Sequence, residues 1–407
     1  MKNIYRGLYC YIILIIITYP LAFTLLNFMS SRFSNGFILF REPELSGVSD
    51  PVKKPSMSLA AFRSGEFQSD FEKYFTHILA TRKLLSRLYN QILYTIFNSN
   101  DSSNIVIGRE NYIYEPAYPQ AYLTEVTNEG EKSLAKKLEE LEELKRLLNE
   151  RGVALIVRMS PTKAEHYPEY LPPAYDRFIR MKQNGEYGPN WYQVFTKEIA
   201  KTTIPFYDRY DLIQEMKRDG HIVFTKGGIH WSLAPIAEYV NGLNAYLEKL
   251  LNKNLGRMII TSEENIAGKM GIIWDSDVWD IRNALYTKPN YLSPNITFNT
   301  LPGKYSPNIL NVGQSFSSIL LYAVYIDPTP PPVWNETYFS SYNTRVIHYS
   351  SSLGSPWGEV ISSKTDDFEL YLSMDVIMIE FLEPTSYPGA TQFDFADNML
   401  SYLKGRN

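Results

Sequence analysis

The sequence has very little cysteine, little histidine and no excess of positive charge. Its only cysteine, Cys10, lies in an apolar run near the N-terminus, so the rest of the chain has no disulfide, no thiolate metal cluster and no cysteine nucleophile. A formal net charge of −4 gives no indication of a nucleic-acid partner. With five histidines in 407 residues, few imidazoles are available for acid–base chemistry.

The longest run without charge is at the N-terminus. Residues Leu8 to Met29 contain no charged side chain, and a helix rising about 1.5 Å per residue would carry them across roughly 30 Å of hydrocarbon. Lys2 and Arg6 precede the run and favour a cytoplasmic N-terminus. A cleaved signal peptide is the alternative, but its apolar region is normally shorter and ends in small residues. We predict a signal anchor in the inner (cytoplasmic) membrane, with residues 1–7 cytoplasmic, a transmembrane helix over 8–29 and the remainder extracytoplasmic or periplasmic.

The remaining sequence has the pattern of an α/β domain. A linker over residues 30–58 is followed by helices and apolar strands in alternation over 59–400, and residues 401–407 form a C-terminal tail. This alternation predicts a mostly parallel sheet flanked by helices. The apolar positions of the first helical region, such as Leu84, Leu88 and Ile92, recur at helical spacing and are expected to pack in a core. The residues from 255 to 307 have no clear pattern. The predicted helices cover 62–97, 131–152 and 232–253, and the predicted strands lie within 103–116, 153–161, 203–213, 221–225, 308–313 and 374–384.

Two segments carry residues of interest for catalysis. His230 lies in a loop that follows two glycines and precedes a predicted helix, and Ser315 comes two residues after Gly313 at the end of an apolar strand. Ligands of open α/β sheets bind beyond the carboxyl ends of the strands. This placement favours Ser315 as a nucleophile and His230 as its base. Each feature alone is also common in proteins without such a site.

Seven segments resemble, in the same order, those of one known family; they cover residues 62–91, 106–116, 157–172, 227–232, 274–281, 312–317 and 375–384. The family is that of the SGNH-hydrolase-like proteins of bacterial polysaccharide O-acetylation, of the AlgX/AlgJ type, the alginate O-acetylation proteins. The resemblance implies a permuted SGNH-hydrolase-like α/β fold that needs neither a metal nor a bound cofactor. It implies Ser315 as the acyl-accepting nucleophile, His230 as the base, and the backbone N–H groups of Ser315 and Gly313 as the oxyanion hole.

The sequence departs from this family at one catalytic position. The family has an aspartate two residues before the histidine, where this chain has Gly228. Losing the orienting acid of a Ser-His-Asp site lowers the rate by on the order of 10⁴. In one interpretation a backbone carbonyl orients His230 in a Ser-His dyad; in another the site is weakened and the protein only binds or scaffolds. The third interpretation is a carboxylate from elsewhere, with the candidates Asp208, Asp211, Asp275 and Asp277.

The resemblance implies a membrane-anchored O-acetyltransferase that moves an acetyl group through an acyl-serine onto hydroxyls of a cell-surface or secreted polysaccharide. Because acetyl-CoA is absent outside the cytoplasm, it also implies a membrane-bound O-acyltransferase as the partner that supplies acetyl groups. Alternatives are a carbohydrate acetyl esterase, which uses water as the acceptor, and a catalytically weakened polysaccharide-binding or assembly subunit. Candidate substrate contacts are the aromatic residues Tyr167, Trp231 and Trp274, since large aromatic rings stack on sugars. Lys163 is a further candidate contact.

Overall fold

The computed structural model describes most of the chain in two compact units, of which the first contains residues 1–105 and 280–287 and the second contains residues 106–279 and 288–407. The unit boundary at residue 105 differs from the predicted linker over 30–58. Each unit is described separately below. The described residues are 2–33, 44–47, 52–79, 81–268, 273–286, 289–301, 303–317, 335–340, 346–349, 359–362 and 367–405.

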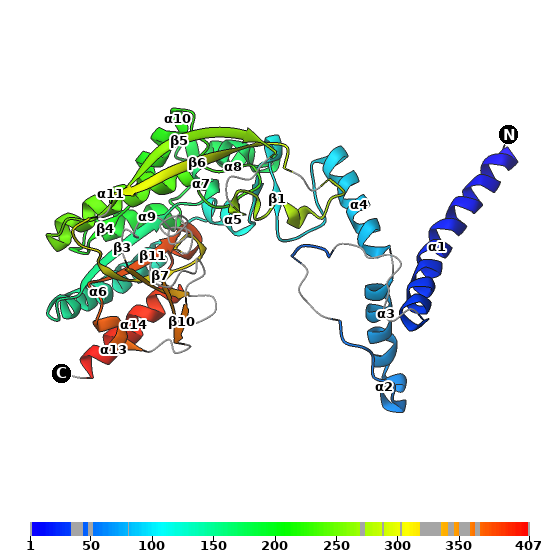
Figure 1. Cartoon of the computed structure of the whole chain (residues 1–407), viewed down its shortest axis with the longest axis horizontal. Helices are drawn as coiled ribbons and strands as arrows, with labels where there is room; N and C mark the ends of the chain where they lie inside the picture. The colour runs from blue at the N-terminus through cyan, green and yellow to red at the C-terminus, as the bar shows by residue number, and fades with distance from the viewer. Residues whose placement is uncertain are drawn as a thin grey trace. The chain divides into compact units, whose positions relative to one another are not determined.

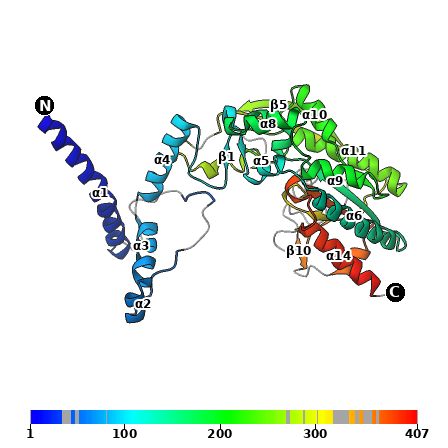
Figure 2. The same cartoon turned by 180° about the vertical axis from the view of Figure 1, so that it is seen from behind.

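The first unit is helical (Figures 1 and 2). Its helices are α1 (Lys2–Phe33), α2 (Leu59–Ser64), α3 (Glu66–Ile78) and α4 (Arg82–Phe97). Among the described residues, α1 is the one helix long and apolar enough to cross a membrane, by length and composition, within Ile13–Ser30. Over 62–97, where one or two helices are predicted, the structure has parts of three, and Gly65 with a φ of +81° ends α2 in a left-handed conformation.

A seven-stranded sheet forms the centre of the second unit. The strand order is β10-β9-β8-β7-β11-β3-β4, with parallel pairing from β8 to β4 and antiparallel pairing from β8 to β10. The predicted, mostly parallel sheet is therefore confirmed. The strands are β3 (Ala154–Ser160), β4 (Phe206–Tyr207), β7 (Asn308–Gly313), β8 (Asn335–Ser340), β9 (Val346–Tyr349), β10 (Glu359–Ser362) and β11 (Val376–Leu382).

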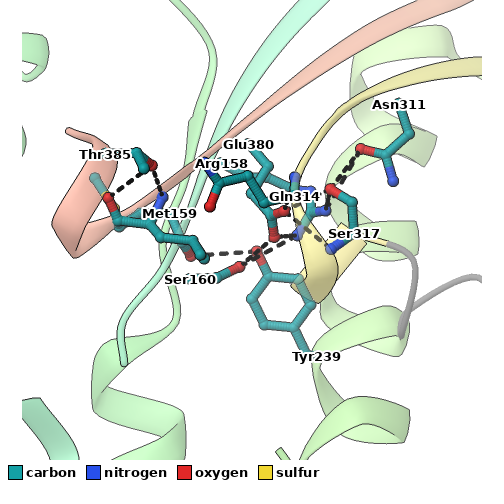
Figure 3. A network of polar contacts seen from close by, with 10 residues as sticks. Arg158, Met159, Ser160, Tyr239, Asn311, Gln314, Ser317, Glu380 and Thr385 are labelled. Atoms are coloured by element: carbon teal, nitrogen blue, oxygen red, sulfur yellow. Dashed lines mark hydrogen bonds and ion pairs between the residues drawn. The ribbon is translucent and has the colours of Figure 1, made fainter. Parts of the chain in front are cut away.

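Helices cover the sheet on both faces (Figure 1). Leucines of α6 pack with residues of α9 and α14 against alternate residues of β3 and β11, such as Leu155 and Ile377, in the main hydrophobic core. On the opposite face, Tyr239 of α11 lies against β3 (Figure 3). The helices are α5 (Ala117–Tyr122), α6 (Asn128–Asn149), α7 (Lys163–His166), α8 (Asp176–Gln183), α9 (Trp191–Ile199), α10 (Tyr210–Arg218), α11 (Leu233–Leu251), α13 (Phe368–Leu372) and α14 (Thr391–Lys404). Short 3₁₀ turns are η1 (Arg109–Asn111), η2 (Pro168–Tyr170), η3 (Pro173–Tyr175), η4 (Ile273–Ser276), η5 (Asp280–Arg282) and η7 (Glu383–Thr385).

Several predicted elements differ from the structure. The unassigned region contains a long antiparallel hairpin, β5 (Arg257–Ala267) with β6 (Leu292–Leu301). By contrast, a smaller hairpin of β1 (Val106–Ile107) and β2 (Ile113–Tyr114) confirms the strands predicted within 103–116. The strand predicted over 203–213 is only β4, followed by α10, and the strand predicted over 221–225 forms a single bridge. Helix α14 also extends into the predicted C-terminal tail.

Candidate active site

A tight loop before α11 presents His230. Phe224 and Trp231 form an antiparallel bridge, and the Ser232 N–H donates to the Val223 carbonyl at 2.8 Å. Ser232 is then the N-cap of α11. The side chain of Trp231 is 1% exposed and anchors the loop in the core. His230 is therefore held between a buried aromatic residue and the start of a long helix.

The imidazole of His230 has a carboxylate partner, although position 228 is glycine. Its Nδ1 lies 2.6 Å from Oδ2 of Asp277, and Oδ1 of the same side chain accepts the backbone N–H of Ile229 at 3.1 Å. Asp277 thus binds the ring and the loop together. Of the four carboxylates considered from sequence, it is Asp277 that contacts His230. Asp208 instead accepts hydrogen bonds from the Tyr192 hydroxyl and the Tyr210 N–H.

The segment that carries Asp277 is fixed to the histidine loop by backbone contacts. The Val278 N–H donates to the Gly227 carbonyl at 3.2 Å. The carbonyl of Asp275 accepts the hydroxyl of Thr225 and, at 2.7 Å, that of Tyr291. These bonds hold the carboxylate beside the imidazole although 47 residues separate the two in the chain.

The side chain of Lys163 binds backbone carbonyls of the same loop. Its ammonium nitrogen lies 2.7 Å from the carbonyl of Thr225, 2.8 Å from that of Gly228 and 2.9 Å from that of Ile113. The side chain is 0% exposed, and burial lowers its pKa well below the usual range while Asp277 opposes the shift. This position does not fit the substrate contact predicted for Lys163. We assign Lys163 to holding the loop in shape.

Replacing Lys163 by methionine is expected to destabilise the second unit by about 1–3 kcal/mol for each buried carbonyl left without a donor. Urea unfolding followed by tryptophan fluorescence reports on this unit, because all six tryptophans lie in it. Lys136→Met, at an exposed position of α6, is the matched control and should change little. Equal stability of the two variants would contradict the assignment.

The turn that carries Ser315 reaches the histidine loop. Strand β7 ends at Gly313, and Ser315 is partly exposed just beyond it. The ring of Phe316, the next residue, lies 4.8 Å from the His230 ring and 5.4 Å from the Trp231 ring, measured between centroids. The two distant segments predicted to converge therefore lie in contact at the carboxyl end of the sheet.

A fully buried ion pair lies beneath this turn (Figure 3). Arg158 of β3 and Glu380 of β11 are both 0% exposed, with Nη1 and Oε1 2.8 Å apart. Oε2 of Glu380 accepts the backbone N–H groups of Gln314 at 3.2 Å and of Ser317 at 2.9 Å. Glu380 also accepts the hydroxyl of Ser317 at 2.6 Å and that of Ser160 at 2.8 Å. The carboxylate thus binds the backbone on both sides of Ser315.

Gly313 is required by this ion pair. A Cβ added at Gly313 would lie 2.1 Å from Oγ of Ser317 and 2.7 Å from Oε2 of Glu380. Gly313→Ala is therefore expected to displace the turn, costing at least about 1–3 kcal/mol of stability and most of any activity that depends on Ser315. Gly188→Ala, whose Cβ would have its nearest neighbour at 3.5 Å, is the control measured in the same unfolding and activity assays. A fully active Gly313→Ala variant would rule out this constraint.

Two other predicted substrate contacts are buried. Tyr167 is 6% exposed and Trp231 only 1%, so neither ring offers a face for a sugar, and both serve packing. The side chain of Trp274 lies outside the described residues. His166, a further histidine, is stacked on Tyr210, and burial lowers its pKa to about 3. Among the described residues, no group of three or more His, Cys, Asp or Glu side chains is arranged to hold a metal.

The sequence interpretation did not single out Arg158 and Glu380. Each is the one charged residue inside an otherwise apolar strand, and the two stand directly opposite each other in the register of β3 and β11. A charge is seldom buried without a partner. Two isolated charges of opposite sign in neighbouring apolar strands were the available signal.

Part of the second unit is similar to known proteins. Residues 106–237 match the model of the SGNH hydrolase-like domain of the acetyltransferase AlgX. A probable alginate O-acetylase AlgJ of Pseudomonas fluorescens is 24% identical over 174 residues, and that of Pseudomonas aeruginosa is 26% identical over 183 residues. Residues 106–237 are thus similar to the SGNH hydrolase-like domain of the AlgX/AlgJ type. The fold is the predicted SGNH-like α/β fold.

The matches of this chain are partial. The alignment with the Pseudomonas fluorescens relative covers 42% of this chain and 40% of that protein; for the Pseudomonas aeruginosa relative the shares are 44% and 42%. The O-acetyltransferase domain of Pseudomonas putida AlgJ is a similar solved structure, with a TM-score of 0.44 and 16% identity over 75% of this chain and 99% of that one. Pseudomonas aeruginosa AlgX has a TM-score of 0.44 and 14% identity over 72% and 67%.

Proposed function

We propose that this chain is an O-acetyltransferase that works through an acyl-serine at Ser315. The observation that carries the proposal is the hydrogen bond between His230 and Asp277 beside the Ser315 turn. It supplies the orienting carboxylate that Gly228 lacks and favours a complete triad over a Ser-His dyad or a weakened site. The similarity of residues 106–237 to the SGNH hydrolase-like domain of the acetyltransferase AlgX supports acetyl transfer as the reaction.

We propose a role for each nitrogen of His230. Nδ1 carries the proton shared with Asp277, which leaves the lone pair on Nε2. Nε2 is buried and has no hydrogen-bond partner among the described residues, so it is available as a base. In the proposed first step Nε2 takes the hydroxyl proton of Ser315 as Oγ attacks the acetyl carbonyl. The proton then passes to the leaving group, and the acetyl group remains on Ser315.

The second half of the reaction uses the same groups. Nε2 removes a proton from a hydroxyl of the acceptor, whose oxygen attacks the acetyl carbonyl, and Ser315 is restored. We assign the backbone N–H of Ser315 to the oxyanion, as the resemblance implies. Glu380 holds the turn around it through the N–H groups of Gln314 and Ser317. Gly313 remains the second candidate donor from the sequence.

We propose a cell-surface or secreted polysaccharide as the acceptor and a membrane-bound O-acyltransferase as the partner that supplies acetyl groups. Helix α1 would anchor the chain in the cytoplasmic membrane with the second unit outside the cytoplasm; its length and composition support this. A cavity of about 480 Å³ next to the histidine loop offers room for a sugar chain; it is lined by Asn111, Tyr112, Ile222, Phe224, Lys226, Ala267, Asn290, Tyr291 and Leu292.

The test is to trap the acyl-enzyme. The full chain in detergent is incubated with 4-nitrophenyl acetate, and the peptide that contains Ser315 is analysed by mass spectrometry for an added acetyl group. We expect the label on the wild type and none on Ser315→Ala, with little on His230→Ala. No label and no ester hydrolysis in the wild type would refute the proposal and leave the binding or assembly role. If the acetyl group on Ser315 is transferred faster to water than to an added polysaccharide, the protein is an acetyl esterase.

A further inference from the structure

Helix α4 has its apolar side exposed. Leu84, Leu85, Leu88, Ile92 and Ile96 recur at helical spacing, and 39% to 67% of each residue is exposed. We call these five residues the apolar face of α4. Amphipathic helices of globular proteins normally turn such a face toward a core. Because these five side chains are exposed instead, the core packing predicted for them is wrong. The one buried residue of α4 is Asn90, which is polar.

The polar side of α4 makes the contacts with the rest of the first unit. An amino group of Arg87 donates to the Glu44 carbonyl at 2.8 Å, and the Asn90 amide lies 3.5 Å from the Asn283 carbonyl. The Gln91 amide oxygen accepts the Tyr286 N–H at 3.2 Å. The helix is thus held through its polar residues, and among the described residues its apolar face is left largely exposed. Contiguous exposed apolar surface of this kind marks an interaction site.

The charge of this region indicates what the partner is. Helix α4 contains Arg82, Lys83 and Arg87 and no acidic residue. Residues 52–100 hold seven Lys or Arg against three Asp or Glu, an excess of four positive charges in a chain whose formal net charge is −4. An apolar face combined with basic residues is typical of helices that lie in the interface of a membrane containing anionic lipids.

The chain also keeps α4 within reach of a membrane. Helix α1 ends at Phe33 and α4 begins at Arg82. Under the proposed anchoring by α1, this intervening segment acts as a tether and gives α4 a high effective concentration at the bilayer. A weak interfacial helix is then sufficient to stay bound.

We infer that the apolar face of α4 lies on the bilayer, with its five apolar side chains in the region between lipid head groups and acyl chains. Arg82 would interact with anionic head groups at the same surface, whereas Lys83 and Arg87 bind Glu44 within the unit. This inference goes beyond the proposed acetyl transfer and does not depend on it. It adds a second membrane contact to the one proposed for α1.

Site-directed spin labelling tests the inference on the full chain. Because Cys10 is the only cysteine, Cys10→Ser gives a background without thiols. Single cysteines are then introduced as Leu88→Cys and Ile92→Cys on the apolar face, and as Lys136→Cys on the exposed side of α6 for the aqueous reference. Each labelled protein is reconstituted into nanodiscs of phosphatidylcholine and phosphatidylglycerol. Collision with oxygen, which concentrates in lipid, is compared with collision with a water-soluble nickel chelate.

The labels at positions 88 and 92 are expected to show a ratio of oxygen to nickel accessibility severalfold higher than the label at position 136. Ratios equal to that of the reference would place the apolar face in water and overturn the inference. Low accessibility to both reagents at 88 and 92 would also overturn it, because the face would then be covered by protein. Two positions on one face protect the test against a local effect of either substitution. Loss of acetyl labelling at Ser315 would not affect this result.

Discussion

Replacing Asp277 by asparagine is expected to slow acetyl transfer by on the order of 10⁴, the cost of losing the orienting acid in a Ser-His-Asp site. Oδ1 of Asp277 accepts the N–H of Ile229, and Oδ2 faces Nδ1 of His230. In the asparagine variant the oxygen would keep the bond to Ile229. The amide NH₂ would then face Nδ1, which forces the imidazole proton onto Nε2, the nitrogen that has to act as the base.

The measurement is the initial rate of 4-nitrophenyl acetate hydrolysis together with the rate of acetyl labelling of Ser315. Asp211→Asn, at an exposed position in the first turn of α10, is the control and should stay within about twofold of the wild type, as expected for a surface site. A wild-type rate in Asp277→Asn would show that a Ser-His dyad is sufficient.

A double variant sharpens this test. The backbone at Gly228 does not have the positive φ seen at six other described glycines, so its conformation is one that residues other than glycine also adopt. Gly228→Asp alone is expected to change the rate little, because His230 already has a carboxylate. Gly228→Asp combined with Asp277→Asn should recover part of the lost rate, because the acid then stands at the position that the family uses. No recovery would indicate that the loop cannot present an acid from position 228.

Replacing Glu380 by glutamine is expected to give the largest loss of stability, about 3–5 kcal/mol, because it leaves the Arg158 charge buried without its partner. Both side chains are 0% exposed. The loss is measured by urea unfolding with tryptophan fluorescence. The control is Glu150→Gln, which removes an exposed pair with Arg146 and should cost no more than about 1 kcal/mol. Similar losses in the two variants would refute the role of the buried pair.

The same substitution should also affect the reaction. Glu380 binds the backbone on both sides of Ser315, and a shift of about 1 Å in a reacting group costs on the order of 10² in rate. The double variant Arg158→Met with Glu380→Gln removes both charges and is expected to be more stable than the sum of the single variants predicts. It should not regain activity, because the turn still lacks its acceptor. Full activity in either variant would show that the turn holds its shape without Glu380.

Much of the fold follows from local patterns in the sequence. The leucines of α6, the buried strand β3 and the strand β7 that ends at Gly313 lie where apolar periodicity predicts them. The hairpin of β5 and β6 was not predicted because many of its residues are exposed and polar, and their pattern has no strict alternation. The apolar stripe of α4 was assigned to a core because periodicity identifies a face and does not say what covers it.

Part of the site was also predictable, from turns and not from apolar periodicity. His230 and Ser315 stand in glycine-bounded turns, which the sequence makes visible, whereas Asp277 is one of several acidic residues in its segment. Asp277 is brought to the imidazole by tertiary hydrogen bonds, such as the one between the Val278 N–H and the Gly227 carbonyl, and these cannot be read from the sequence. The role of Lys163 depends on carbonyl groups from separate segments, and no sequence pattern reports the direction of a backbone carbonyl.

The contact between Asp277 and His230 bears on how relatives are recognised. Because the carboxylate comes from a separate stretch of chain, position 228 no longer needs to be acidic and is free to change during evolution. A search that demands an acid two places before the histidine would miss chains that present the carboxylate from elsewhere. Pairing the glycine-containing loop with a downstream acidic segment gives a criterion that would retain them.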